Sequence, residues 1–361
     1  MQPTSAMLPY WTLAAPVAAW LILAGTLAGL GGWYALPMTL ALLASVIAAV
    51  HHAEVVAHRV GEPFGTLVLA VAVTTIEVGL IVSLMVSGGA ATAALARDTV
   101  FAAVMIILNG MVGLCLLLGS QRHGEQTFTL TGVSASLATL AAIVVLTLVL
   151  PNYTLTTPGP MYSGSQLGFI AFVSLALYGT FLLVQTVRHR DYFLPAGGAG
   201  GPDSHANPPS RRTAFTSGGL LAVSLAAVVL LGKALAPSIG HAVAAAGAPQ
   251  ALVGIIIALV VLLPESLAAV RAARANRLQT SLNLALGSAL ASIGLTIPAV
   301  AIVSLVTGWT LLLGIDAKST VLLVLSLMVA TLSLSTGRTT VLQGVVHLVI
   351  FAVYVFITVV P

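Results

Sequence analysis

The stretch Leu67-Val-Leu-Ala-Val-Ala-Val-Thr-Thr-Ile-Glu77-Val-Gly-Leu-Ile-Val-Ser-Leu-Met85 is apolar along almost its whole length, yet it holds one carboxylic acid. A run of about 20 apolar residues predicts a helix that crosses a lipid bilayer. An acid inside such a helix costs roughly 2.5 to 3.5 kcal/mol on insertion scales and so indicates a functional site. A second acid lies in the comparable run Gly254-Ile-Ile-Ile-Ala-Leu-Val-Val-Leu-Leu-Pro-Glu265-Ser. We therefore expect a fold that buries two carboxylates within membrane-spanning helices.

The composition of the whole chain agrees with this interpretation. Hydrophobic residues make up 59% of the sequence and charged residues 6%, against about 25% charged residues in soluble domains. The sequence predicts an all-α polytopic membrane protein with eleven transmembrane helices. We expect them near residues 11–30, 35–57, 65–87, 98–119, 129–150, 166–187, 215–234, 249–270, 280–305, 319–335 and 341–360.

The distribution of basic residues predicts the orientation, because cytoplasmic loops carry the excess of Lys and Arg. With the N-terminus in the cytoplasm, only Arg97, Lys233 and Lys318 of the thirteen Lys and Arg residues lie on the outer side. We therefore place the N-terminus inside and the C-terminus outside. The first apolar stretch has no basic residue before it and is long, so we expect it to remain as a helix and not to be cleaved as a signal peptide.

The chain divides into a helix within residues 1–34, a five-helix segment 35–187, a linker 188–214 and a second five-helix segment 215–361. Glycine and proline in the linker predict a flexible cytoplasmic connection without a packed domain. Because five is an odd number, the second segment enters the membrane from the opposite side, which is the topology of an inverted repeat.

The two acids occupy corresponding places, since each lies in the second helix of its segment. Glu77 comes twelve residues after Gly65, roughly 18 Å from the start of its helix at 1.5 Å per residue. Glu265 comes fifteen residues after Gln250, roughly 22 Å from the start of its own. In a hydrocarbon layer of about 30 Å both fall toward the middle from opposite sides, so the sequence predicts that they meet at one site.

Two carboxylates at the bilayer midplane suit the exchange of two protons for one divalent cation, because both loaded forms are electrically neutral. Burial and mutual repulsion disfavour the doubly ionised state, so protons and cation would compete. Ca²⁺ takes six to eight oxygen ligands, so neighbouring oxygens must complete the site. The candidates are Thr74, Thr75, Asn109, Ser288 and Ser292, with backbone carbonyls near Pro264.

Each of these candidates also has a structural interpretation. The acids could be protonated structural groups, and Pro264 could mark a tolerated kink or a broken helix. Gly287 with Ala291, and Ser288 with Ser292, have the small-xxx-small spacing that permits close helix packing. Both interpretations stay open at this point.

A second polar group, with His51, His52, His58, Glu54 and Glu62, precedes the third predicted helix. Its spacing does not match H-E-x-x-H, so we do not expect catalytic zinc chemistry. A solvated helix end is favoured, with a cytoplasmic gate or pH sensor as the alternative, because histidine titrates near neutral pH.

Two other isolated residues have simpler interpretations, and one class of partner is excluded. For His347, in the last helix, packing is favoured over proton relay. Cys115 is the only cysteine and predicts neither a disulfide nor a thiolate metal site. The dispersed basic residues do not indicate a nucleic-acid surface.

Several motifs together resemble those of a known family. They are Gly61-Glu-Pro-Phe-Gly-Thr, Thr75-Ile-Glu-Val, Leu263-Pro-Glu-Ser, Asn283-Leu-Ala-Leu-Gly-Ser-Ala-Leu-Ala-Ser and Ser335-Thr-Gly-Arg-Thr. From about residue 35 to 361 the chain resembles the calcium/cation antiporter superfamily, specifically its bacterial ChaA-type sodium/calcium-proton antiporters.

The resemblance implies a cation/proton exchanger of the bacterial inner membrane with two inverted repeats. It implies that Glu77 and Glu265 bind the transported cation, with Asn109, Gly287, Ser288 and Ser292 in the helices that follow. Relatives often carry an acidic, histidine-containing central loop. This linker offers only Asp191, Asp203, His189 and His205, so regulatory cation binding there is not expected.

We therefore expect a secondary transporter that exchanges cytoplasmic Ca²⁺, with Na⁺ or K⁺ as further substrates, for external protons by alternating access. It would need no cofactor beyond the transported ions. A cation channel lined by the same carboxylates is the main alternative, and it would show flux without proton counter-movement. An intramembrane hydrolase is not supported by any serine or zinc constellation. The sequence does not indicate an oligomeric state.

Overall fold

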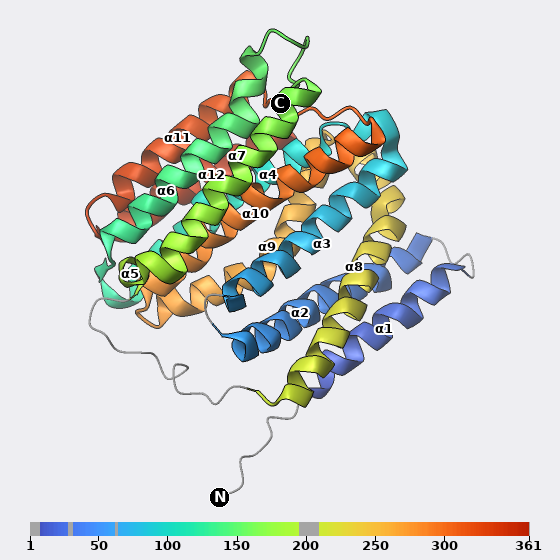
Figure 1. Ribbon diagram of the computed structural model, residues 1–361, viewed down its shortest axis with the longest axis horizontal. Coiled ribbons are helices and arrows are strands. Elements are labelled where there is room, and N and C mark those ends of the chain that lie inside the picture. The colour runs from blue at the N-terminus through green and yellow to red at the C-terminus, as the bar shows by residue number, and fades with distance from the viewer. Residues whose placement is uncertain (1–7, 28–31, 62–63, 195–208, 361) are drawn as a thin grey trace, which may run out of the picture. The chain divides into compact units, whose positions relative to one another are not determined.

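The structure is a computed structural model that describes residues 8–27, 32–61, 64–194 and 209–360, and these are almost entirely helical (Figure 1). All eleven predicted spans are helices within these residues. The segments are α1 Tyr10–Leu27, α2 Ala35–Val60, α3 Phe64–Gly88, α4 Leu95–Met105 continued by η3 Ile106–Met111 and α5 Val112–His123, α6 Leu130–Val144 with η4 Val145–Val149, α7 Gly164–Leu183 with η6 Val184–Arg188, α8 Arg211–Ala245, α9 Ala251–Arg274, α10 Leu278–Thr307, α11 Ala317–Leu334 and α12 Val341–Val359.

Nine of the described segments are long and apolar enough to cross a membrane, and α1 and α11 are shorter apolar helices. The chain is thus a multi-pass membrane protein. The largest difference from the predicted bounds is at α8, which extends well beyond 215–234. The hydroxyl of Ser210 caps α8 by accepting a hydrogen bond from the backbone N–H of Thr213 at 3.1 Å. The ends of the predicted linker are therefore ordered as η7 (Arg190–Phe193) and the start of α8, while residues 195–208 lie outside the described part.

Two short strands of two residues each accompany the helices. Strand β1 (Gln126–Thr127) pairs antiparallel with β2 (Arg338–Thr339). A two-residue strand has no measurable period in sequence, so these residues are indistinguishable from ordinary loop residues. The ribbon joins the connection between α5 and α6 to the connection between α11 and α12.

The chain forms two compact units, Met1–Gly89 with Gly200–Ala246 and Ala90–Ala199 with Gly247–Pro361. We call them unit one and unit two. Each unit contains helices from both five-helix segments, so the compact units are different from the sequence repeats. The division into repeats stays a prediction about sequence symmetry.

Unit one consists of α1, α2, α3 and α8, and α8 packs against each of the other three. A small residue permits the close approach of α3 to α8. A Cβ added at Gly79 would lie 2.5 Å from Cγ2 of Val229, which is closer than carbon atoms approach each other.

Unit two is built around α10, which packs against α4, η3, α5, α6, α7 and α9. The continuous segment Leu95–His123 is the most buried of the candidate spans. Such burial explains why its apolar residues cover the whole circumference of the helix and form no single stripe.

The loops of unit two show an internal symmetry. The α6–α7 connection binds the α10–α11 connection, where the backbone N–H groups of Leu313 and Gly314 donate to the carbonyl of Pro160 at 3.1 and 3.0 Å. The β1–β2 ribbon joins the α5–α6 and α11–α12 connections. In both loop pairs, the connection between the fourth and fifth helices of one five-helix segment binds the connection between the third and fourth helices of the other segment. The packing of α7 on α10 and of α12 on α5 follows the same relation. This relation is what an inverted repeat requires.

Candidate functional site

Glu77 lies in the middle of α3, and its side chain is buried, with 3% exposed. The two threonine candidates in the preceding turn differ in their exposure to solvent. Thr74 is buried, and its hydroxyl has no hydrogen-bond partner among the described residues. Thr75 is exposed, and its hydroxyl donates to the carbonyl of Val71 at 2.7 Å. Because residues three apart share a helix face, Thr74 and not Thr75 lies on the face of Glu77.

Glu265 lies in α9 of unit two, and its side chain is 7% exposed. Pro264 precedes it, yet α9 is continuous from Ala251 to Arg274. The structure therefore shows that the helix tolerates this proline and is not broken by it. Proline still lacks an N–H, so the carbonyl four residues earlier, at Val260, cannot receive its usual helical hydrogen bond.

Asn109 occupies the one irregular turn of the segment Leu95–His123, the π-helical turn η3. π-Turns widen a helix locally and often lie at functional sites. The side chain of Asn109 is fully buried. Its Nδ2 donates to Oγ of Ser326 on α11 at 2.9 Å, while its Oδ1 has no hydrogen-bond partner among the described residues.

The helix that carries the α10 candidates packs against this turn and against α9. Ser292 is buried, and Ser288 and Gly287 are half-buried. A Cβ added at Gly287 would meet no described atom of unit two within 4 Å, so close packing within that unit does not explain this glycine. Within unit two the structure therefore brings Glu265, Asn109 and Ser292 onto mutually packed elements.

Glu77 belongs to unit one and Glu265 to unit two, so each is described within its own unit. The meeting of the two acids stays a prediction. No group of three or more His, Cys, Asp or Glu residues that could hold a metal ion occurs among the described residues. A site for Ca²⁺ would therefore rely on neutral oxygens beside its carboxylates.

The histidine group near the end of α2 does not form one cluster. His52 is fully buried, and its Nε2 lies 3.1 Å from the carbonyl of Thr12 on α1. The ring of His51 contacts those of Trp11 and His52, with centroids 5.5 and 5.8 Å apart. This arrangement joins α1 to α2.

The remaining described members of the group differ from these two histidines in exposure. Glu54 and His58 are exposed, and Glu62 lies outside the described residues. Two members of the group are therefore exposed at the end of α2, and two histidines contact α1.

Sequence reasoning missed several polar residues of unit two. Ser326 contacts Asn109, as described above. Ser333, one heptad further along α11, lies with its Oγ 2.8 Å from Nε2 of the buried His347. The spacing of seven residues between the two serines was a usable signal, because it places both on one face of α11. Thr296, one turn after Ser292 on α10, is fully buried, and its hydroxyl has no partner among the described residues.

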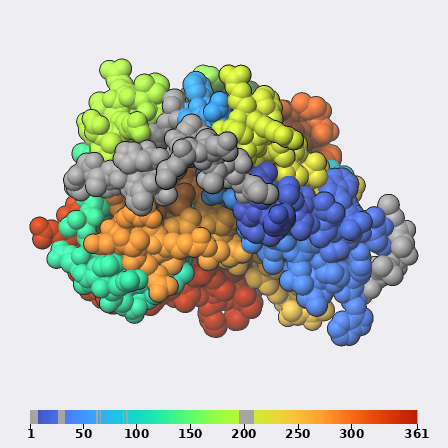
Figure 2. Space-filling view, turned by 90° about the horizontal axis from the view of Figure 1, so that it is seen from below, coloured from blue at the N-terminus to red at the C-terminus, as the bar shows by residue number. Residues whose placement is uncertain are grey.

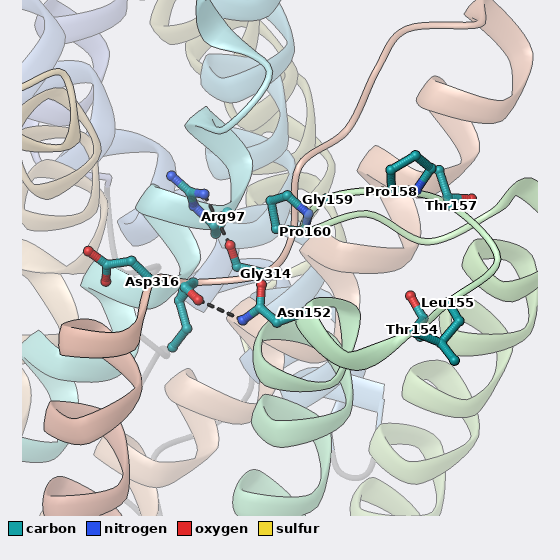
Figure 3. Close-up of a pocket in the computed structure, with 11 residues that line it drawn as sticks. Arg97, Asn152, Thr154, Leu155, Thr157, Pro158, Gly159, Pro160, Gly314 and Asp316 are labelled. Atoms are coloured by element: carbon teal, nitrogen blue, oxygen red, sulfur yellow. Dashed lines mark hydrogen bonds between the residues drawn. The ribbon is translucent and has the colours of Figure 1, made fainter.

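A pocket of about 450 Å³ lies at the α6–α7 and α10–α11 connections (Figure 3). Arg97 donates through Nη1 to the carbonyl of Gly314 at 3.1 Å and through Nε to Oδ1 of Asp98 at 2.8 Å. Asn152 donates to the carbonyl of Ile315 at 2.6 Å. These bonds fix the loop that precedes α11.

The opposite ends of the unit-two helices carry basic residues. Figure 2 shows the α9–α10 turn, in orange, beside the α5–α6 connection, in teal. Nε2 of His123 lies 3.0 Å from the carbonyl of Arg274, and Nε2 of Gln126 donates to the carbonyl of Ala273 at 3.0 Å. Arg271 and Arg274 lie in the last turn of α9, where positive charge suits the helix dipole.

Comparison with known proteins identifies the family. The profile of the family described as sodium/calcium exchanger protein matches residues 30–187 and 216–360. The chain belongs to this family. Its members are ion exchangers and not enzymes, and the resemblance to the calcium/cation antiporter superfamily is confirmed. The profile leaves residues 188–215 unmatched between its two ranges.

Two curated relatives align over most of their length. The chain is 49% identical over 370 residues to a putative ionic transporter, y4hA, of Sinorhizobium fredii, covering 100% of this chain and 99% of that one. It is 38% identical over 315 residues to the sodium-potassium/proton antiporter ChaA of Escherichia coli, covering 87% and 85%.

Solved structures share the fold at low sequence identity. The structure of native YfkE matches with a TM-score of 0.75 and 16% identity, covering 97% of this chain and 100% of that one. The H⁺/Ca²⁺ exchanger CAX matches with a TM-score of 0.72 and 16% identity, covering 96% and 88%.

Proposed function

We propose that this exchanger moves a cytoplasmic cation outward in return for protons by alternating access, at a site to which Glu77 and Glu265 each contribute a carboxylate. The observation that carries the proposal is the pair of buried acids at corresponding places in two halves that the family profile matches separately. A buried acid in a membrane helix is costly, so two of them at equivalent positions need a shared chemical reason.

The charge balance explains the coupling. With both acids ionised the site has a charge of minus two, and either one Ca²⁺ or two protons restore neutrality. An empty, doubly charged site would be too costly to carry through a low-dielectric interior. Only the loaded forms would then cross between inward-open and outward-open states, which is the requirement for exchange.

Neutral oxygens would complete the ligand set. Thr74 shares a helix face with Glu77, and Asn109 and Ser292 lie on elements packed against the helix of Glu265. Thr75 is a weaker candidate, because it is exposed and bonded to Val71. Ser288 and Gly287 would line the approach to these groups.

Ca²⁺ is the first substrate to test, because it matches the charge of two carboxylates. Na⁺ and K⁺ form a second candidate set, supported by the 38% identical relative, which is named a sodium-potassium/proton antiporter. A single monovalent ion would leave one carboxylate to be protonated or to bind a second ion.

The membrane and the orientation are also part of the proposal. We place the chain in the bacterial inner membrane, with the N-terminus in the cytoplasm. In this orientation Glu54 and His58 face the cytoplasmic side, where they could act as a gate or pH sensor together with Glu62, His51 and His52.

The test uses everted membrane vesicles in which respiration has set a pH gradient, reported by acridine orange. Addition of CaCl₂, NaCl or KCl should collapse the gradient in wild type. Glu77→Gln and Glu265→Gln should each abolish the Ca²⁺-dependent collapse. Glu125→Gln, at an exposed acid that pairs with Arg338 at 3.6 Å, is the matched control and should behave as wild type.

The outcomes separate the alternatives. Full exchange activity in both glutamine variants would refute the shared site. Cation flux without proton movement would indicate a channel. A variant that loses Ca²⁺ exchange but keeps Na⁺ exchange would show that one carboxylate is sufficient for a monovalent ion.

A further inference from the structure

Ser326 on α11 makes a hydrogen bond that determines the orientation of a neighbouring amide. Its Oγ lies 2.7 Å from the carbonyl of Leu322, one turn earlier in the same helix, and 3.5 Å from Sδ of Met105. A hydroxyl has one proton, and a carbonyl oxygen is a far better acceptor than a thioether sulfur. The proton of Ser326 is therefore donated to Leu322, and its oxygen can only accept.

This assignment fixes the amide of Asn109. The group that faces Ser326 at 2.9 Å must be a donor, which is Nδ2. If the amide were flipped, Oδ1 would face an oxygen that has no proton to offer, and two acceptors would repel each other. The orientation of an asparagine amide is decided by its hydrogen-bond network, and here the network permits only one.

The consequence concerns the other end of the amide. Oδ1 of Asn109 is fully buried and has no hydrogen-bond partner among the described residues. Buried carbonyl oxygens nearly always have a partner, so an exception needs an explanation. The amide oxygen is also one of the ligands that Ca²⁺ accepts in proteins.

We propose that Ser326 is a positioning residue for cation binding: it holds the amide of Asn109 so that Oδ1, and not Nδ2, is presented to the transported ion. The inference rests on the proposed function, in which Asn109 is a cation ligand. Ser326 itself does not touch the ion.

Loss of the hydroxyl should weaken cation binding without changing the exchange mechanism. In Ser326→Ala the amide can rotate, and the orientation that directs Nδ2 toward the ion is no longer penalised. One neutral hydrogen bond corresponds to roughly a three- to tenfold change in an equilibrium constant. The KM for the cation should rise by about that factor while the maximal rate stays near that of wild type. Ser326→Thr keeps a hydroxyl and should restore a low KM.

A carboxylate at position 109 provides the decisive comparison. Neither oxygen of an aspartate can donate to Ser326, so the Ser326 oxygen no longer favours one orientation over the other, and both orientations present an acceptor to the ion. Ser326→Ala should therefore not raise the KM in the Asn109→Asp background.

Ser333→Ala is the matched control. It removes a buried hydroxyl from the same face of α11, bonded in the same way to the carbonyl of Val329 at 2.7 Å, but next to His347 and not Asn109. Its KM should be that of wild type.

The measurement is the initial rate of gradient collapse in everted vesicles over a range of CaCl₂ concentrations, repeated with NaCl. KM does not depend on the amount of transporter, so reduced expression does not imitate the effect. The proposal is wrong if Ser326→Ala keeps the wild-type KM. It is also wrong if Ser333→Ala or Ser326→Thr raises the KM by as much as Ser326→Ala does. It is wrong, too, if Ser326→Ala raises the KM by the same factor when residue 109 is aspartate. If Asn109→Asp is inactive, the KM values of Ser326→Ala, Ser326→Thr and Ser333→Ala decide whether the proposal holds. Wild-type vesicles that move no protons with any of the cations would instead refute the proposed function.

Discussion

Gly254 of α9 should be intolerant of even one added methyl group. An added Cβ would lie 2.9 Å from the carbonyl carbon of Asp98 and 2.9 Å from the backbone N of Thr99, both in α4. Carbon atoms in contact lie about 3.5 to 4.0 Å apart, so α4 and α9 would have to separate by about half an ångström or more. Because these obstacles are backbone atoms, no side-chain rotation can relieve the clash.

The expected cost follows from two opposing terms. Overpacking of a close contact costs about 1–3 kcal/mol, and a backbone obstacle places this case in the upper part of that range. Replacing glycine by alanine inside a helix returns up to about 1 kcal/mol. Gly254→Ala should therefore lower the free energy of unfolding by about 1–2 kcal/mol.

The assay is SDS titration of the purified protein in mild detergent, followed by the helical circular dichroism signal. The control is Gly179→Ala on α7, where an added Cβ meets no described atom within 4 Å. That variant should be as stable as wild type or slightly more stable. Equal stability of the two variants would contradict the close contact of α4 with α9, and with it the route by which Glu265 is positioned beside the segment that carries Asn109.

Three further substitutions should have smaller effects. Burial raises the pKa of Tyr162 to about 12, against about 10 in the unfolded chain. The unfolded state therefore ionises first, and the free energy of unfolding falls as pH rises from about 10 to about 12. Tyr162→Phe should reduce this loss in unfolding titrations, and an unchanged dependence of stability on pH would contradict the prediction. Asn152→Ala should cost about 1 kcal/mol, because the carbonyl of Ile315 loses its side-chain donor, whereas an unchanged unfolding midpoint would show that the bond is not important. His52→Ala should loosen the start of α1 from α2 at the carbonyl of Thr12, measured as a lower midpoint of SDS unfolding, and a wild-type midpoint would argue against that role.

The sequence was sufficient to locate the helices, because spans of about 20 apolar residues are a strong signal. The sequence also singled out Glu77 and Glu265, since charge inside such a span is rare, and the structure buries both side chains, while their role in cation binding stays a prediction. The π-turn at Asn109 has no such signal. It depends on which backbone hydrogen bonds form, and an apolar sequence is equally compatible with a regular α-turn.

The environments of the individual side-chain oxygens could likewise not be predicted from the sequence. Thr74 and Thr75 are adjacent and chemically identical, and only their burial and the bond of Thr75 to Val71 distinguish them. The partner of Asn109 is 217 residues away in the chain, so no local pattern could reveal that Ser326 holds it. Side-chain chemistry could be predicted from the sequence, but pairing between distant helices could not.

The two five-helix segments of this exchanger differ in their local irregularities. In the first half, the third helix is widened by the π-turn at Asn109, and the acid-bearing helix has Ile76 before Glu77. In the second half, the third helix α10 has no such turn, and Pro264 precedes the acid. Under the proposed alternating access between two inverted repeats, identical halves would make the inward-open and outward-open states equal in free energy, because each state is the other with the halves exchanged. The unequal irregularities remove that equality, so they, and not the repeat itself, would set which state predominates when the site is loaded.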